Sequence, residues 1–140
     1  MNINDCLLEG LLKKDKPSLD KARSSLDMAK HKLEIAEKEH DNEIYEGSII
    51  SVYSSMFHSC RALLFKDGFK ERSHYVVYVY VKEKYFDKFE KGYLNELNSM
   101  RLERHELMYG LIKSKEGYEV ESESAISVAK YFLEKVKSII

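Results

Sequence analysis

The sequence has almost none of the residue that most reliably breaks a helix. Proline occurs once among the 140 residues, as Pro17. A proline inside a helix removes a backbone hydrogen bond and clashes with the preceding turn, so the long stretches without proline are free to be helical. With 44% hydrophobic residues and this length, the chain can bury one hydrophobic core.

Other absences exclude classes of protein. The two cysteines, Cys6 and Cys60, lack the spacing of a metal site and are too few for a disulfide framework. No apolar run approaches the roughly 20 residues of a membrane span. The N-terminal segment carries Glu9 in place of the basic residues that open a secretory signal. We therefore expect a soluble, cytoplasmic protein that has no membrane partner.

The chain also lacks an excess of either charge. It has 23 basic and 24 acidic residues, for a formal net charge of −1. This balance argues against a general nucleic-acid coat, so any contact with RNA or a nucleotide is expected at a local patch. The histidines are scattered without a known metal-ligand spacing, and the sequence predicts no metal and no other cofactor.

Apolar residues recur at helical spacing through most of the chain. The predicted helices cover residues 3–14, 19–40, 43–66, 73–86, 88–112 and 122–139. Ser18 is expected to cap the second helix, and Gly68 to end the third. Residues 114–122 are expected to form a loop. Since no change in composition divides the chain, we place no domain boundary and predict an all-α helical bundle.

One segment has the composition of a strand. Residues 75–81 are all valine or tyrosine, which are common in β-sheets. However, no second strand-like run exists to pair with its backbone groups. We therefore predict a short, mostly buried helix for this segment.

The most informative segment is residues 101–110, RLERHELMYG, where arginines stand at positions that a helix would normally give to leucine. The heptad-like apolar stripe around it consists of Leu94, Leu97, Met108 and Leu111. Arg101 and Arg104 occupy the inward positions within that stripe. Guanidinium groups there are costly unless they are paired, reach water or meet a ligand. The alternatives are a positively charged cleft, pairing with Glu103 or Glu106, or pairing across an interface.

A second group of polar residues lies on the small-residue face of the helix over 43–66. His58 and Arg61 are one turn apart there, and could form a second wall of the same cleft. The alternative is that His58 is satisfied inside the core or an interface. His74 follows Ser73 at a helix start, so we assign this pair to capping and not to chemistry.

Three blocks in order carry a family resemblance. Residues 51–64 have the sequence SVYSSMFHSCRALL, which is followed by Gly68 and Ser73-His74, and then by the arginine-containing segment that ends in Tyr109-Gly110. This resembles the HEPN family (higher eukaryotes and prokaryotes nucleotide-binding domain). The similarity is greatest to its small stand-alone archaeal and bacterial members, which show S/A-x-Y-x-x-M-F-H-x-x-R-A-L-L.

The resemblance implies a single HEPN domain over residues 1–140, folded as a four- to five-helix up-and-down bundle. It also implies a homodimer whose arginine motif faces a cleft at the dimer axis. Many family members are metal-independent ribonucleases, and others are the toxin paired with a minimal nucleotidyltransferase antitoxin. The catalytic motif resembles R-[N/D/H]-x(3–5)-H. Arg104-His105 matches its start, and Tyr109 stands where the closing histidine is expected.

From these features we predict a toxin-like HEPN component that binds RNA or a nucleotide in an arginine-lined cleft and could cleave RNA without metal. In this hypothesis Arg101 and Arg104 hold phosphate, with His58 and Arg61 as further contacts. His105 transfers protons, while Tyr109 orients it or is modified by a partner. The alternative is a non-catalytic module that dimerises and docks onto a nucleotidyltransferase. The absent closing histidine favours this alternative, whereas the charged inward face favours the first hypothesis.

Overall fold

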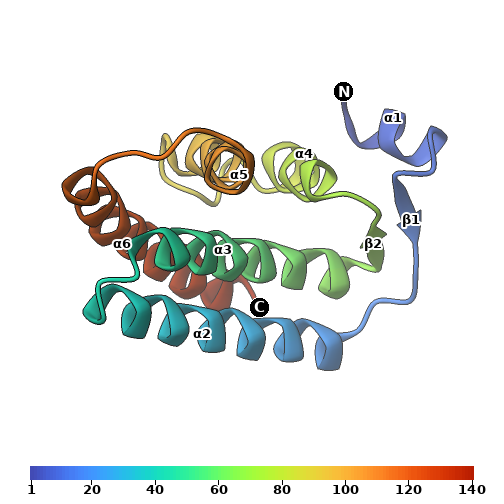
Figure 1. Ribbon diagram of the computed structural model, residues 1–140. Coiled ribbons are helices and arrows are strands. Elements are labelled where there is room, and N and C mark those ends of the chain that lie inside the picture. Colours follow the sequence, from blue (N-terminus) through green and yellow to red (C-terminus); the bar gives the residue numbers. More distant parts are fainter.

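The computed structural model describes residues 1–140 as six helices and two short strands (Figure 1). The elements are α1 (Ile3–Leu8), β1 (Leu12–Lys14), α2 (Leu19–Asp41), α3 (Tyr45–Asp67), β2 (Phe69–Glu71), α4 (His74–Lys84), α5 (Tyr93–Tyr109) and α6 (Lys115–Ile139). The predicted all-α bundle is confirmed. The valine- and tyrosine-rich segment is helical, as predicted, and forms most of α4.

The helices α2 and α3 form a closely packed antiparallel pair (Figure 1). Ala29 and Ala36 of α2 are fully buried, so their small side chains let the two backbones approach. Two buried serines of α3 use this proximity. Ser55 donates a hydrogen bond to the carbonyl of Ala29 at 2.8 Å, and Ser48 donates one to the carbonyl of Ala36 at 2.7 Å. These two hydroxyls are therefore satisfied across the interface.

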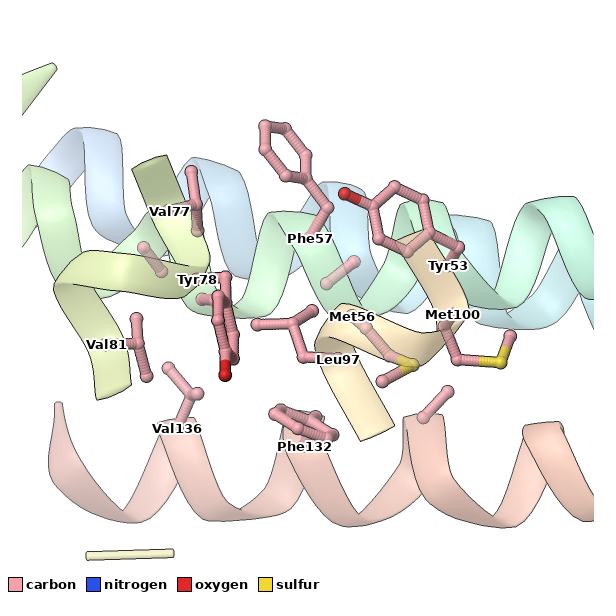
Figure 2. Packing of buried hydrophobic residues seen from close by; sticks show 14 of the residues in the cluster. Tyr53, Met56, Phe57, Val77, Tyr78, Val81, Leu97, Met100, Phe132 and Val136 are labelled. Atoms are coloured by element: carbon pink, nitrogen blue, oxygen red, sulfur yellow. The ribbon is translucent and has the colours of Figure 1, made fainter. Parts of the chain in front are cut away.

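The helices α4 and α5 cross α3 instead of running beside it. Figure 1 shows both of them end-on above α3, whereas α2 and α3 lie across the view. Leu97 and Met100 of α5 are buried near Met56 of α3 and Phe132 of α6 (Figure 2). This crossing places the start of α4 and the second half of α5 over the same side of α3.

The prediction of one helix over residues 3–14 is wrong. The helix α1 ends at Leu8, and Gly10 has a φ of 73°, which glycine adopts without the steric cost that a side chain would add. The chain then continues as β1, which pairs antiparallel with β2 in the register Leu12 with Glu71. Leu12 is 1% exposed, so its burial and the pairing together outweigh helix propensity.

The end of the chain also differs from the prediction. The helix α5 is shorter than the predicted 88–112, since it follows Gly92 (φ 95°) and ends at Tyr109. The predicted loop over 114–122 is wrong, because α6 already begins at Lys115. The Ser114 side chain caps it by accepting a hydrogen bond from the Gly117 amide at 3.2 Å. Tyr118 is 5% exposed, and its burial stabilises a helix that includes Gly117, a residue expected to lie in the loop.

A single carboxylate joins the end of α3 to α4 and the turn after it. Asp67 is 11% exposed at its side chain, and Oδ2 accepts hydrogen bonds from the hydroxyls of Tyr80 at 2.7 Å and Tyr85 at 2.6 Å. Both tyrosines are themselves buried. Because hydrogen bonds to a charged acceptor are stronger than neutral ones, Asp67 should be a main stabilising contact between these elements.

We predict that Asp67→Ala lowers the free energy of unfolding by about 2–4 kcal/mol, because it leaves two buried hydroxyls without an acceptor. Tyr85→Phe removes one of the two bonds and should cost about 1–2 kcal/mol. Urea unfolding measures both values. The control Asp87→Ala, at an exposed position, should stay within about 0.5 kcal/mol of wild type. Equal effects of the two aspartate variants would contradict the role given to Asp67.

Candidate functional site

Arg104 lies on the core-facing side of α5. It follows Leu97 and Met100 at helical spacing, and both of these residues are buried. Arg104 itself is half-buried and forms no ion pair and no side-chain hydrogen bond. The acidic neighbour Glu103 instead pairs with Lys113 at 2.9 Å. The guanidinium of Arg104 is therefore held at the edge of the core without an acidic partner in this chain.

Arg101 lies beside it, one turn earlier, and is also half-buried. Its Nε donates a hydrogen bond to Oδ1 of Asn98 at 3.2 Å. The guanidinium carbon lies 5.1 Å from the centre of the Tyr75 ring, a cation–π contact between α5 and α4. These contacts orient Arg101 but leave its positive charge uncompensated.

The predicted stripe is only partly correct. Met108 is 48% exposed and Leu111 is 93% exposed, so neither faces inward as expected. The inward row runs through Leu97, Met100 and Arg104. Met108 lies in the last turn of α5, beyond the part of this row that the core covers, and Leu111 follows the end of the helix. Arg101 consequently lies at the flank of the buried face and Arg104 lies within it.

The ring of His74 sits directly above α3. It stacks on Phe57 with 4.2 Å between ring centres and 11° between planes, and Nδ1 lies 3.0 Å from the hydroxyl oxygen of Tyr53. Tyr53 and Phe57 are nearly buried and project from the same side of α3 (Figure 2). His74 remains exposed at its outer edge, so one face of the imidazole is covered while its other nitrogen has no hydrogen bond.

The electrostatic surroundings link this ring to the arginines. Burial lowers the pKa of His74, and the charges of Arg104, Arg101 and Arg61 lower it further, while Glu71 acts in the opposite direction. Charged side chains of α3 and α5 thus act on the ring of His74, the first residue of α4. We call His58, Arg61, His74, Arg101 and Arg104 the arginine–histidine cluster.

His58 and Arg61 form the α3 part of this cluster. His58 is half-buried with its ring edge-on to Phe57, and burial, followed by the charge of Arg61, lowers the pKa of His58 to about 4. Nε of Arg61 lies 2.6 Å from Oε1 of Glu71, at ion-pair distance although without hydrogen-bond geometry. Arg61 also lies over the ring of Phe65 at 4.8 Å. Unlike the arginines of α5, Arg61 therefore already has an acidic partner.

His58 and Arg61 also line a surface depression of about 390 Å³ between α2, α3 and β2. Lys21 and Lys70 add positive charge to its wall, and Asp15 adds the opposing carboxylate. His58 is thus both partly packed and accessible from one side. Across the whole chain, no group of three or more histidine, cysteine or acidic side chains is arranged to hold a metal ion.

Comparison with known families confirms the predicted family. The model of the HEPN domain matches residues 22–139, which covers five of the six helices and every member of the arginine–histidine cluster. The chain belongs to the HEPN family. HEPN domains are generally associated with ribonuclease, nucleotide-binding and toxin-like roles, and they often dimerise. No curated protein matches the sequence.

This HEPN chain places His105 and Tyr109 apart from the cluster. Both are exposed, Tyr109 to 72%, and their ring centres lie 4.9 Å apart on successive turns of α5. Because His105 directly follows Arg104, its side chain leaves the helix about 100° away from that of Arg104. Within one chain, His105 and Tyr109 contact each other but make no side-chain hydrogen bond to the arginines.

The sequence analysis missed the central position of His74. The hydroxyl of Ser73 caps α4 by accepting a hydrogen bond from the Val76 amide at 3.4 Å, so capping explains Ser73 but not His74. The available signal was that Ser73-His74 belongs to the blocks on which the resemblance to the HEPN family rests. Spacing along the chain could not reveal that His74 lies over Tyr53 and Phe57.

Exposed apolar side chains follow the arginines in the sequence. They lie at the end of α5 and in the connection after it, and are 48–93% exposed: Met108, Tyr109, Leu111 and Ile112. We call them the apolar end of α5.

None of the chain's helices has the length and apolar character needed to span a bilayer.

We predict that Arg104→Leu raises the free energy of unfolding by about 0.5–1 kcal/mol, because an apolar side chain replaces an unpaired charge on the core-facing row. The matched variant Arg61→Leu should instead lower it by about 2–3 kcal/mol, since it leaves Glu71 without its partner. Urea unfolding of both proteins checks this contrast. A loss above about 1 kcal/mol for Arg104→Leu would show that Arg104 is a structural residue.

The depressed pKa of His58 also predicts a pH dependence. The unfolded chain binds a proton at this ring near pH 6.5, whereas the folded chain binds it only near pH 4. The contribution of His58 to the free energy of unfolding is therefore complete above pH 6.5 and is lost as the pH falls toward 4. His58→Gln should therefore lose less stability than wild type between pH 7 and pH 4.5. The control His31→Gln, at an exposed site on α2, should follow wild type. Titration of the His58 ring near pH 6.5 in NMR spectra would contradict the prediction.

Proposed function

We propose that this chain is the toxin-like HEPN component of a HEPN/minimal-nucleotidyltransferase pair. It acts in the cytoplasm as a single domain over residues 1–140 and binds RNA or a nucleotide through the phosphate. The observation that carries the proposal is the pair Arg101 and Arg104, half-buried on α5 with no acidic partner, of which Arg101 lies over the ring of Tyr75, the residue next to His74.

The residue types suit a phosphate. A guanidinium presents two parallel N–H donors that match two phosphate oxygens, and partial burial strengthens such a contact by reducing competition from water. Arg61 is less available because Glu71 already neutralises it. With a net charge of −1, the chain has no overall attraction for polyanions, so recognition depends on this local cluster.

Cleavage without metal requires a proton acceptor, a proton donor and a cation beside the phosphate. Arg101 and Arg104 supply the cation in this proposal. His105 transfers the proton, and Tyr109, which contacts its ring, orients it or is the residue that a partner modifies. A two-fold homodimer would bring a second copy of α5 to the same cleft and would supply the second proton-transfer group.

A specific observation favours a second function, that of a non-catalytic docking module. In the apolar end of α5, Leu111 is 93% and Ile112 is 84% exposed. Exposed apolar side chains that gather on one surface are typical of an interaction site. In this alternative the α5 region dimerises and holds the nucleotidyltransferase, while the arginines fix the orientation of the complex.

We predict that Arg101→Ala/Arg104→Ala weakens binding of a single-stranded RNA oligonucleotide at least about tenfold, measured by fluorescence anisotropy. The slope of log K against log salt should fall by about 1.4, because two phosphate contacts are lost. The control Arg23→Ala/Lys91→Ala removes two exposed charges from elsewhere and should keep both affinity and slope. Circular dichroism and sedimentation show that each variant stays folded and keeps its oligomeric state.

The same proteins decide between binding and cleavage when they are incubated with RNA in excess chelator. Cleavage by the wild type that a folded double variant loses would make this chain a metal-independent ribonuclease. Binding without cleavage would support the docking module. If the wild-type chain binds neither RNA nor a nucleotide, the proposed function is wrong.

A further inference from the structure

The orientation of His74 leaves one ring nitrogen for a ligand. Stacking on Phe57 fixes the plane of the ring, and the contact between Nδ1 and the Tyr53 hydroxyl fixes its rotation. Nε2 makes no hydrogen bond within the chain, and the ring edge is exposed. A histidine that serves only as packing would not need to be held on two sides while one nitrogen stays free.

We propose that Nε2 of His74 contacts the phosphate held by Arg101 and Arg104, and that binding of this phosphate is coupled to uptake of a proton by the ring. This inference rests on the proposed function, to which it adds His74 as a phosphate contact and the uptake of one proton on binding. It also identifies an imidazole, supplied by α4, in a chain whose α5 motif has Tyr109 where the closing histidine would stand.

The hydrogen bond to Tyr53 determines what Nε2 can do. Burial raises the pKa of Tyr53, so its hydroxyl keeps its proton. When the ring is neutral and Nδ1 accepts from this hydroxyl, the ring proton lies on Nε2, which then donates to a phosphate oxygen. When the ring is protonated, Nδ1 donates to the Tyr53 oxygen and Nε2 still donates to phosphate. Both states therefore favour an anion at Nε2, and the protonated state favours it more.

The charged groups around His74 explain the coupling. On α3 these are His58 and Arg61, on α5 they are Arg101 and Arg104, and β2 contributes Glu71, which Arg61 already engages. In the free protein the positive charges oppose protonation of the ring. A phosphate between the arginines and His74 compensates these charges, so the bound state takes up a proton at a higher pH than the free state does. Affinity must then rise as the pH falls through the bound-state pKa.

The test measures binding of a fluorescein-labelled single-stranded RNA oligonucleotide between pH 5.5 and pH 8, in excess chelator at fixed salt. If the phosphate raises the pKa of His74 by one unit, the wild-type affinity increases about tenfold toward low pH. His74→Gln keeps a polar side chain but cannot titrate, so its profile should be flat by comparison. The control His31→Gln should retain the wild-type profile.

A second measurement does not depend on how a variant folds. The His74 ring of the wild-type protein is titrated by NMR with and without inorganic phosphate, and its pKa should rise when phosphate is present. Tyr53→Phe keeps the aromatic ring but removes the hydroxyl, and it should reduce this rise. If the wild type binds RNA but His74→Gln shows the same pH profile and phosphate leaves the His74 titration unchanged, the inference is wrong and the proposed function stands. If the wild type does not bind RNA at any pH, both fail.

Discussion

The packing of α3 is the constraint on which the rest of the structure depends. Thirteen of its 23 residues are buried, so this helix is covered on several sides and each neighbour must find a surface on it. Toward α2 the contact is made by alanines and by serines whose hydroxyls bond to carbonyls of the partner helix. On another side, Tyr53 and Phe57 provide the aromatic surface on which His74 rests. The arrangement of the candidate site is therefore a consequence of how the central helix is packed.

The crossing of α4 and α5 over α3 has an electrostatic consequence. It brings three arginines and two histidines together in a chain whose formal charge is nearly zero. Arg61 is balanced by Glu71, whereas Arg101 and Arg104 are not balanced within the chain. Unbalanced charge at the edge of a core costs stability. The anion-binding role proposed for these arginines would offset that cost, because the ligand supplies the missing charge.

Arg101 and Arg104 of the cluster lie directly before the apolar end of α5 in the sequence. In the proposed function the arginines bind a phosphate and the exposed apolar residues contact an apolar surface, so the second half of α5 would combine two kinds of recognition. In a dimer the two properties would serve one purpose, because burial of the apolar residues would enclose the arginines and reduce competition from water. This combination agrees with a family whose members often dimerise.

Local features of the sequence were sufficient to predict much of the helical structure. Caps and stops such as Ser18 and Gly68 act within one helical turn, and the structure has both. The helix over the valine and tyrosine residues followed from the absence of a strand partner, and the inward position of Arg104 followed from periodicity. The paired strands β1 and β2 were missed because each has only three residues and their partners are distant along the chain.

The sequence by itself therefore determined the fold class, most of the helices and the inward position of Arg104, since these depend on interactions between residues close in the chain. Only the tertiary structure decided that Met108 and Leu111 are exposed, that α6 begins at Lys115, and that His74 lies beside Tyr53 and the arginines. The start of α6 depends on the Ser114 cap and on the burial of Tyr118, whereas the position of His74 depends on the angle at which α4 and α5 cross α3. That angle is set by the packing of many side chains at once, and no short segment of the sequence encodes it.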